Sequence, residues 1–87
     1  MDRKDIREVV LLELRRIAPE LAAEEIAEKK PLRDQVDLDS MDWLNFLVAL
    51  HERLSVEIPE ADYRRLGTLE QIVDYVSRRV KTTPNRS

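Results

Sequence analysis

Apolar residues recur at helical spacing in three stretches of this chain, and this periodicity limits the fold more than any other feature. In the first stretch, intervals of 4, 4 and 3 residues place four side chains on one helix face: Ile6, Val10, Leu14 and Ile17. No useful run of alternating apolar and polar residues predicts a strand, and the chain has only one glycine. The sequence therefore predicts an all-α fold, a four-helix bundle of three longer helices and one short helix with a long first loop.

Prolines and a glycine separate the predicted helices. Pro19 follows the first helix, Pro59 follows the second, and Gly67 ends a short third helix. Thr68 and Gln71 form a capping box, a pair that satisfies free backbone N–H groups at the start of the last helix. The predicted helices therefore cover residues 2–17, 39 or 40–54, 60–66 and 68–80.

A long connection, residues 18–39, joins the first two helices. Residues 20–29 are expected to form a helical turn that docks Leu21, Ala22 and Ile26 on the bundle, and Leu32 and Val36 are expected to anchor the remainder. At 87 residues the chain is short enough for one modest core. We expect a single domain over residues 1–81 and a frayed tail over residues 82–87.

Composition excludes several classes of site. The chain has no cysteine, which removes disulfides, thiolate metal sites and a cysteine nucleophile, and His51 is its single histidine. No apolar run approaches the roughly 20 residues of a membrane span. The charged start, residues 1–7, lacks the apolar core of a signal peptide. We therefore expect a monomeric, cytoplasmic protein without a bound metal.

Charge is concentrated in the middle of the chain. Residues 34–62 hold eight acidic residues and a single basic one, Arg53, whereas the remaining residues carry a positive balance. The simplest interpretation is a solvated acidic face. An acidic segment also opposes a nucleic-acid partner and favours partner proteins with basic surfaces.

The second predicted helix is apolar on more than one side. One face follows intervals of 4, 3 and 4 and is assigned to the core: Trp43, Leu47, Leu50 and Leu54. A second face follows intervals of 3 and 4, and comprises Met41, Leu44 and Val48, while Phe46 points in a third direction. Such a helix is either central in the fold or keeps a face for a partner. Acidic neighbours favour a docking face with a charged rim: Asp37, Asp39, Asp42 and Glu52.

Ser40 stands at the predicted start of this helix, with Asp39 as the N-cap. Free backbone N–H groups and the helix dipole favour a phosphate ester at such a position. A serine there is usually only a capping residue, so its position alone leaves both roles open.

The surrounding residues resemble a known family. Asp39-Ser40-Met41 is similar to the Asp-Ser-Leu signature of acyl carrier proteins, in which the serine carries 4′-phosphopantetheine. Four further segments match the family in order and spacing: Pro31-Leu32-Arg33-Asp34, Ala49-Leu50-His51-Glu52-Arg53-Leu54, Glu57-Ile58-Pro59-Glu60, and Thr68-Leu69 to Val76. Two positions depart from the family pattern, because Asp37 replaces the usual glycine and Met41 replaces the usual leucine.

The resemblance implies a carrier rather than an enzyme. A phosphopantetheinyl transferase would use coenzyme A and Mg²⁺ to attach the arm to Ser40, with Asp39 orienting the site. The thiol of the arm lets a cysteine-free chain hold acyl or aminoacyl groups as thioesters for a fatty acid, polyketide or related pathway. Partners would be ligases, synthases or acyltransferases with basic docking surfaces, received by Met41, Leu44, Val48, Asp37, Asp42 and Glu52.

Three other functions compete with this one. An unmodified interaction module of the same fold would bind partners without an arm. A small enzyme would need a dyad, but Ser40 and His51 are 11 residues apart, about 16 Å along one helix. A DNA-binding domain conflicts with the acidic second helix, and Arg78, Arg79 and Lys81 are simply favourable charges near a helix C-terminus.

Trp43 bears on the cargo. The family resemblance implies that space beneath the second helix can shelter an acyl chain and that Trp43, three residues after Ser40, lies beside it. An aromatic side chain buries about 150–250 Å². We expect this indole to fill part of the space and to favour short or polar cargo, unless it serves only as a core anchor.

Overall fold

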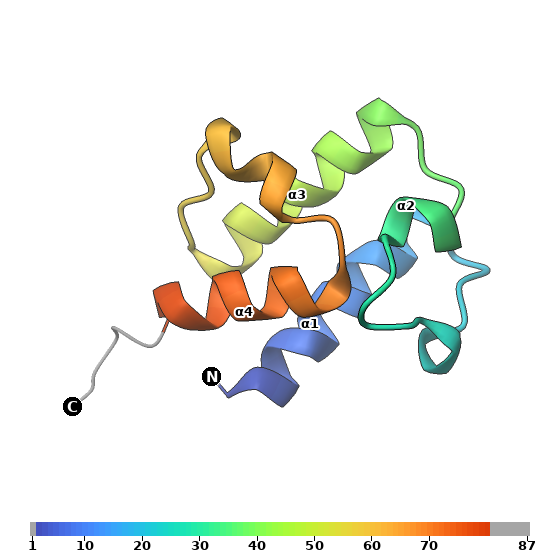
Figure 1. Cartoon of the computed structure of the whole chain (residues 1–87), viewed down its shortest axis with the longest axis horizontal. Helices are drawn as coiled ribbons and strands as arrows, with labels where there is room; N and C mark the ends of the chain where they lie inside the picture. Colours follow the sequence, from blue (N-terminus) through green and yellow to red (C-terminus); the bar gives the residue numbers. More distant parts are fainter. Residues whose placement is uncertain (1, 81–87) are drawn as a thin grey trace.

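The computed structural model of the chain describes residues 2–80, which are largely helical (Figure 1). Its elements are α1 (Arg3–Ile17), the 3₁₀ helix η1 (Ala23–Glu25), α2 (Leu32–Gln35), α3 (Ser40–Leu54), the 3₁₀ helix η2 (Glu60–Arg65) and α4 (Leu69–Val80). The predicted all-α fold is confirmed: α1, α3 and α4 are the three longer helices, and η2 is the short one. The predicted tail, residues 82–87, lies outside the described residues, so the domain boundary at residue 81 stays a prediction.

Side-chain caps start the longer helices, and the cap of α4 is the predicted one. The Asp2 carboxylate accepts a hydrogen bond from the Asp5 N–H at 2.9 Å and starts α1. The capping box at α4 is complete, because the Gln71 N–H donates to Thr68 Oγ1 at 3.1 Å and the Thr68 N–H donates to Gln71 Oε1 at 3.0 Å. None of the described helices is long and apolar enough to cross a membrane.

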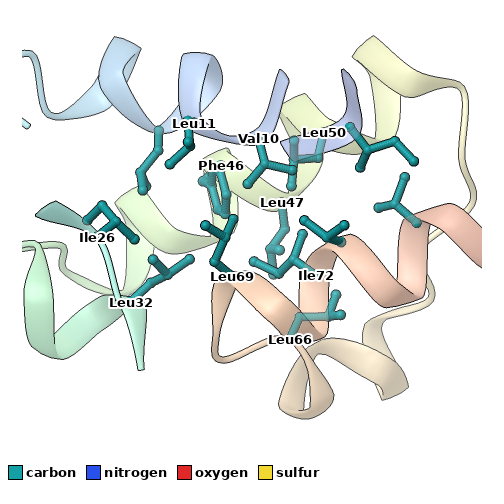
Figure 2. Packing of buried hydrophobic residues seen from close by; sticks show 14 of the residues in the cluster. Val10, Leu11, Ile26, Leu32, Phe46, Leu47, Leu50, Leu66, Leu69 and Ile72 are labelled. Atoms are coloured by element: carbon teal, nitrogen blue, oxygen red, sulfur yellow. The ribbon is translucent and has the colours of Figure 1, made fainter. Parts of the chain in front are cut away.

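A single apolar cluster lies between α1, α3 and α4. Helix α1 packs against both α3 and α4, and it contributes Ile6, Val10 and Leu14 to the cluster, each fully buried. Figure 2 shows Phe46 in the middle of the cluster, with Leu69 of α4 beside it. Burial of these side chains is the main stabilising term of such a bundle, at roughly 1.5–3 kcal/mol for each large apolar residue.

The core face of α3 differs from the prediction. Leu47 and Leu50 are fully buried as expected, but Phe46, which the sequence analysis placed in a separate direction, is also fully buried. Trp43 and Leu54 pack against the cluster but are only half-buried. They therefore lie at its edge, and their assignment to the interior was only partly correct. The Trp43 ring packs against Phe46 at a centroid distance of 5.2 Å, and Trp43 also lines a surface hollow. The buried residues of α3 are therefore Phe46, Leu47 and Leu50, and the indole lies at the edge of the cluster.

The long connection contains one unpredicted helix, α2. Leu32, which was expected to be a loop anchor, begins this helix and is fully buried, and its N–H donates to the Gly67 carbonyl at 2.8 Å. The Gln35 side chain accepts from the Ala27 N–H at 2.7 Å and donates to the Ala27 carbonyl at 2.9 Å. Gln35 also donates to the Lys30 carbonyl at 2.9 Å. These bonds fasten the connection just before α3.

Polar contacts complete the packing. Glu13 of α1 is buried, and its carboxylate pairs with Arg53 of α3 at 3.0 Å and with Arg16 at 3.7 Å. The Tyr75 hydroxyl of α4 donates to Asp62 of η2 at 2.6 Å. Burial and this hydrogen bond raise the pKa of the Tyr75 phenol above its ordinary value of 10.0. The Glu13–Arg53 pair joins α1 to α3, and the Tyr75–Asp62 hydrogen bond joins α4 to η2.

Candidate functional site

Ser40 is the first residue of α3, and its side chain is exposed to solvent. The long connection delivers the chain to this point in an extended conformation, since Asp39 has φ −85° and ψ −179°. The hydroxyl forms no hydrogen bond with the described part of the chain. An accessible hydroxyl without an internal partner is free to accept a covalent group.

Asp39 is the N-cap of α3, as predicted. Its carboxylate accepts a hydrogen bond from the Asp42 N–H at 2.8 Å, and its carbonyl accepts one from the Trp43 N–H at 3.0 Å. These bonds fix the first turn of α3 and therefore the direction in which the Ser40 side chain projects from the helix. The remaining first-turn N–H groups and the positive end of the helix dipole lie next to the hydroxyl. A phosphodiester on this oxygen fits the site.

The predicted docking residues lie on the face of α3 opposite the core. At about 100° per residue, Met41, Leu44 and Val48 point away from Phe46 and Leu50. Met41 is 64% exposed, Leu44 37% and Val48 40%, whereas Phe46 and Leu50 are fully buried. These three residues, hereafter the exposed stripe, form an apolar band that starts one residue after Ser40.

The acidic residues expected around the exposed stripe have different positions. Asp42 lies in the first turn of α3 and is half-buried. Glu52 is exposed, and it follows Val48 by one helical turn, which continues the line of the stripe. Asp37 is exposed and borders a hollow of about 330 Å³ that is otherwise lined by residues 18–36 of the connection. Asp42 and Glu52 therefore belong to α3, while Asp37 belongs to the approach to it.

The backbone at Asp37 has no need of glycine. Ser55 is the one described non-glycine residue with a positive φ, so position 37 has a conformation open to any side chain. The departure from the family pattern at this position therefore causes no strain in the loop before Ser40. Gln35, two residues earlier, holds this loop through the backbone bonds described above. This role was not predicted from the sequence, because hydrogen bonds to backbone atoms leave no residue pattern.

His51 is far from Ser40. It lies in the last turn of the same helix, is exposed, and its Nδ1 is 2.7 Å from the Val56 carbonyl oxygen. The two residues therefore stand near opposite ends of α3. They form no catalytic dyad, as their sequence separation predicted.

A family model for the phosphopantetheine attachment site matches residues 5–76. The chain belongs to the acyl carrier protein family. It is therefore an acyl carrier, and its domain is the place where 4′-phosphopantetheine is attached covalently. Carrier domains interact with a phosphopantetheinyl transferase and with biosynthetic enzymes.

Individual proteins agree with this assignment. The carrier is similar to an acyl carrier protein of Wolinella succinogenes, at 29% identity over 72 residues that span 83% of this chain and 88% of the relative. Its fold is similar to the solution structure of a candidate acyl carrier protein from Anaplasma phagocytophilum, with a TM-score of 0.79, 24% identity and coverage of 98% and 97% of the two chains. The acyl carrier protein of Enterococcus faecalis gives a TM-score of 0.73 at 21% identity, over 91% of this chain and 99% of that one.

Proposed function

We propose that Ser40 is the residue to which the 4′-phosphopantetheine arm is attached. The observation that carries the proposal is the exposed hydroxyl at the first position of α3, directly after the Asp39 cap. The helix N-terminus offers N–H groups and a partial positive charge to the phosphodiester. Asp39 orients the residue through the first turn of the helix, and it takes no part in bond making.

The exposed stripe is the proposed docking surface. Met41, Leu44 and Val48 offer apolar area beside Ser40, and the acidic residues Asp42 and Glu52 flank this area. An apolar centre with a charged rim is the usual arrangement of a transient protein interface. Partners that present a basic surface around an apolar hollow fit it, and the acidic balance of residues 34–62 would accelerate their association.

The chain acts as a carrier without catalytic activity of its own. It presents acyl or aminoacyl groups as thioesters to the ligases, synthases or acyltransferases that act on them. The supporting observation is that His51, the single histidine of the chain, lies in the last turn of α3, at the opposite end of the helix from Ser40, so the two cannot act as a Ser–His pair.

Transfer of the arm tests the proposed function. The purified chain is incubated with coenzyme A, Mg²⁺ and a broad-specificity phosphopantetheinyl transferase. Intact-mass spectrometry should then show that the chain has gained one increment of about 340 Da. Ser40→Ala should abolish the increment. Ser77→Ala is the matched control, because it removes a hydroxyl that bonds only the Asp74 carbonyl at 3.0 Å, and it should be modified like the wild type. Modification of Ser40→Ala would contradict the proposal.

A further inference from the structure

A hollow of about 320 Å³ lies beside Trp43, between α3, η2 and the start of α2. Its apolar wall is formed by Pro31, Trp43, Tyr63 and Leu66, together with Gly67. Trp43 follows Ser40 by three residues, so it lies about 4.5 Å further along the helix axis. The arm on Ser40 is several times longer than this rise. The end of the arm can therefore fold back into the hollow.

The charged side chains of this hollow are two arginines. Arg33 and Arg64 line it, and no carboxylate does. This is unexpected, since the residues between them, 34–62, hold eight acids and one arginine. The fold brings the two flanks of the acidic segment together, through the Pro31–Thr68 bridge and the hydrogen bond from Leu32 to Gly67. A cationic site thus arises next to the acidic helix.

Neither arginine is used by the fold. Both side chains are exposed, and within residues 2–80 neither guanidinium forms an ion pair or a hydrogen bond with a protein group. Arg53, by contrast, is committed to Glu13. A guanidinium matches a carboxylate through two parallel N–H···O bonds, and the indole and phenol beside the arginines supply an apolar wall.

We propose that this hollow receives acyl cargo that has a short apolar body and a carboxylate at its far end. The inference rests on the proposed attachment of the arm to Ser40. The apolar body of the cargo lies against Trp43 and Leu66, and its terminal carboxylate meets Arg33 and Arg64. The thioester itself is unchanged by this binding, so the interaction selects and shelters cargo without a chemical step.

The test uses the single tryptophan of the chain as its probe. A broad-specificity transferase loads Ser40 directly from adipyl-coenzyme A or from 6-methylheptanoyl-coenzyme A, in which an isopropyl group replaces the carboxylate at equal size. The adipyl form should shift Trp43 emission and raise the unfolding temperature by about 3–6 °C over the unacylated holo form. The 6-methylheptanoyl form should give less than half of both effects. Raising the salt to 0.5 M should weaken the adipyl effects, because the arginines are exposed and screened.

Variants assign the effect to the two arginines. Arg33→Gln and Arg64→Gln should each reduce the adipyl-induced shift at least twofold, and the double variant should abolish it. Arg15→Gln is the matched control, an exposed α1 arginine that lies outside the hollow and lacks a carboxylate partner within residues 2–80, and it should leave the shift unchanged.

Several results would overturn the inference. Equal effects of the two cargoes would show a plain apolar hollow, and an adipyl shift that survives the double variant would remove the arginines from the site. The holo form without acyl cargo is the remaining comparison. If Arg33→Gln or Arg64→Gln already changes the Trp43 emission of this form, the two arginines bind the phosphate of the arm rather than the cargo. A full mass gain with no adipyl effect defeats this inference alone, whereas failure to load Ser40 at all defeats the proposed function as well.

Discussion

At the scale of single residues, the buried carboxylate of Glu13 is the least expected feature. It is 4% exposed, and Arg53 reaches it from α3 while keeping part of its own side chain in water. An ionised group in this position requires its partner, because removal of one member of a buried pair leaves an uncompensated charge. The pair therefore fixes how α1 and α3 pack rather than adding much net stability.

Arg53→Ala should destabilise the fold by about 1–2 kcal/mol, less than for a fully buried pair because Arg53 is partly exposed and Arg16 remains near Glu13. Urea unfolding followed by circular dichroism measures this loss. Arg15→Ala, on the same protein, should change the unfolding free energy by less than about 0.5 kcal/mol. If Arg53→Ala leaves the free energy of unfolding unchanged, water already solvates the Glu13 carboxylate.

Ser55 shows a second residue-scale effect. It ends α3 in the left-handed conformation, with φ 53° and ψ 41°, which a residue with a Cβ atom adopts at a cost. Ser55→Gly should therefore stabilise the protein by about 0.5–1 kcal/mol. A rise in the urea midpoint at constant slope would show it, and a fall in the midpoint would show that the serine side chain contributes more than the strain costs.

At the scale of elements, α3 combines a core face and an exposed stripe. Apolar spacing alone could locate both faces, and the exposures of Met41, Leu44 and Val48 agree with the predicted solvent side. Spacing could not rank the core residues. Phe46 and Trp43 differ by three positions, and the contacts of neighbouring helices, which are absent from a local pattern, decide that Phe46 is interior and Trp43 is at the edge.

Substitutions on the two faces of α3 should separate folding from docking. Val48→Ala should lower the unfolding free energy by less than about 1 kcal/mol, since Val48 is 40% exposed, while Leu50→Ala should cost about 2–5 kcal/mol as a cavity in the core. Urea unfolding compares the two variants directly. If Val48→Ala is as damaging as Leu50→Ala, the exposed stripe is structural and the docking proposal fails.

Other elements show where a sequence pattern stops being informative. The caps of α3 and α4 were predicted correctly, because Asp39 and the Thr68–Gln71 pair act on backbone groups three residues away. Helix α2 was not predictable. The N–H of its first residue, Leu32, donates to the carbonyl of Gly67, more than 30 residues along the chain. The Gln35 side chain bonds to backbone carbonyl groups, which every residue has, so these bonds leave no sequence pattern.

At the scale of the whole molecule, the fold brings together two arginines from the flanks of the acidic segment. The acidic segment spans residues 34–62 and includes α3. Arg33 and Arg64, which flank this segment, both line the hollow beside Trp43. The sequence predicted the acidic segment and the serine within it. It did not predict the meeting of the two arginines, because that requires the pairing of residues 31–32 with residues 67–68. The docking surface and the cargo site that we propose thus lie on different sides of the same helix.

The central claim is the identity of the modified residue, and a tryptic digest of the modified chain tests it most directly. Cleavage after Arg33 and Arg53 releases residues 34–53, a peptide in which Ser40 is the only residue with a hydroxyl group. We predict that tandem mass spectrometry finds the whole increment of about 340 Da on this peptide, with loss of the pantetheine fragment on collision. An increment on any other peptide, with residues 34–53 unmodified, would contradict the account.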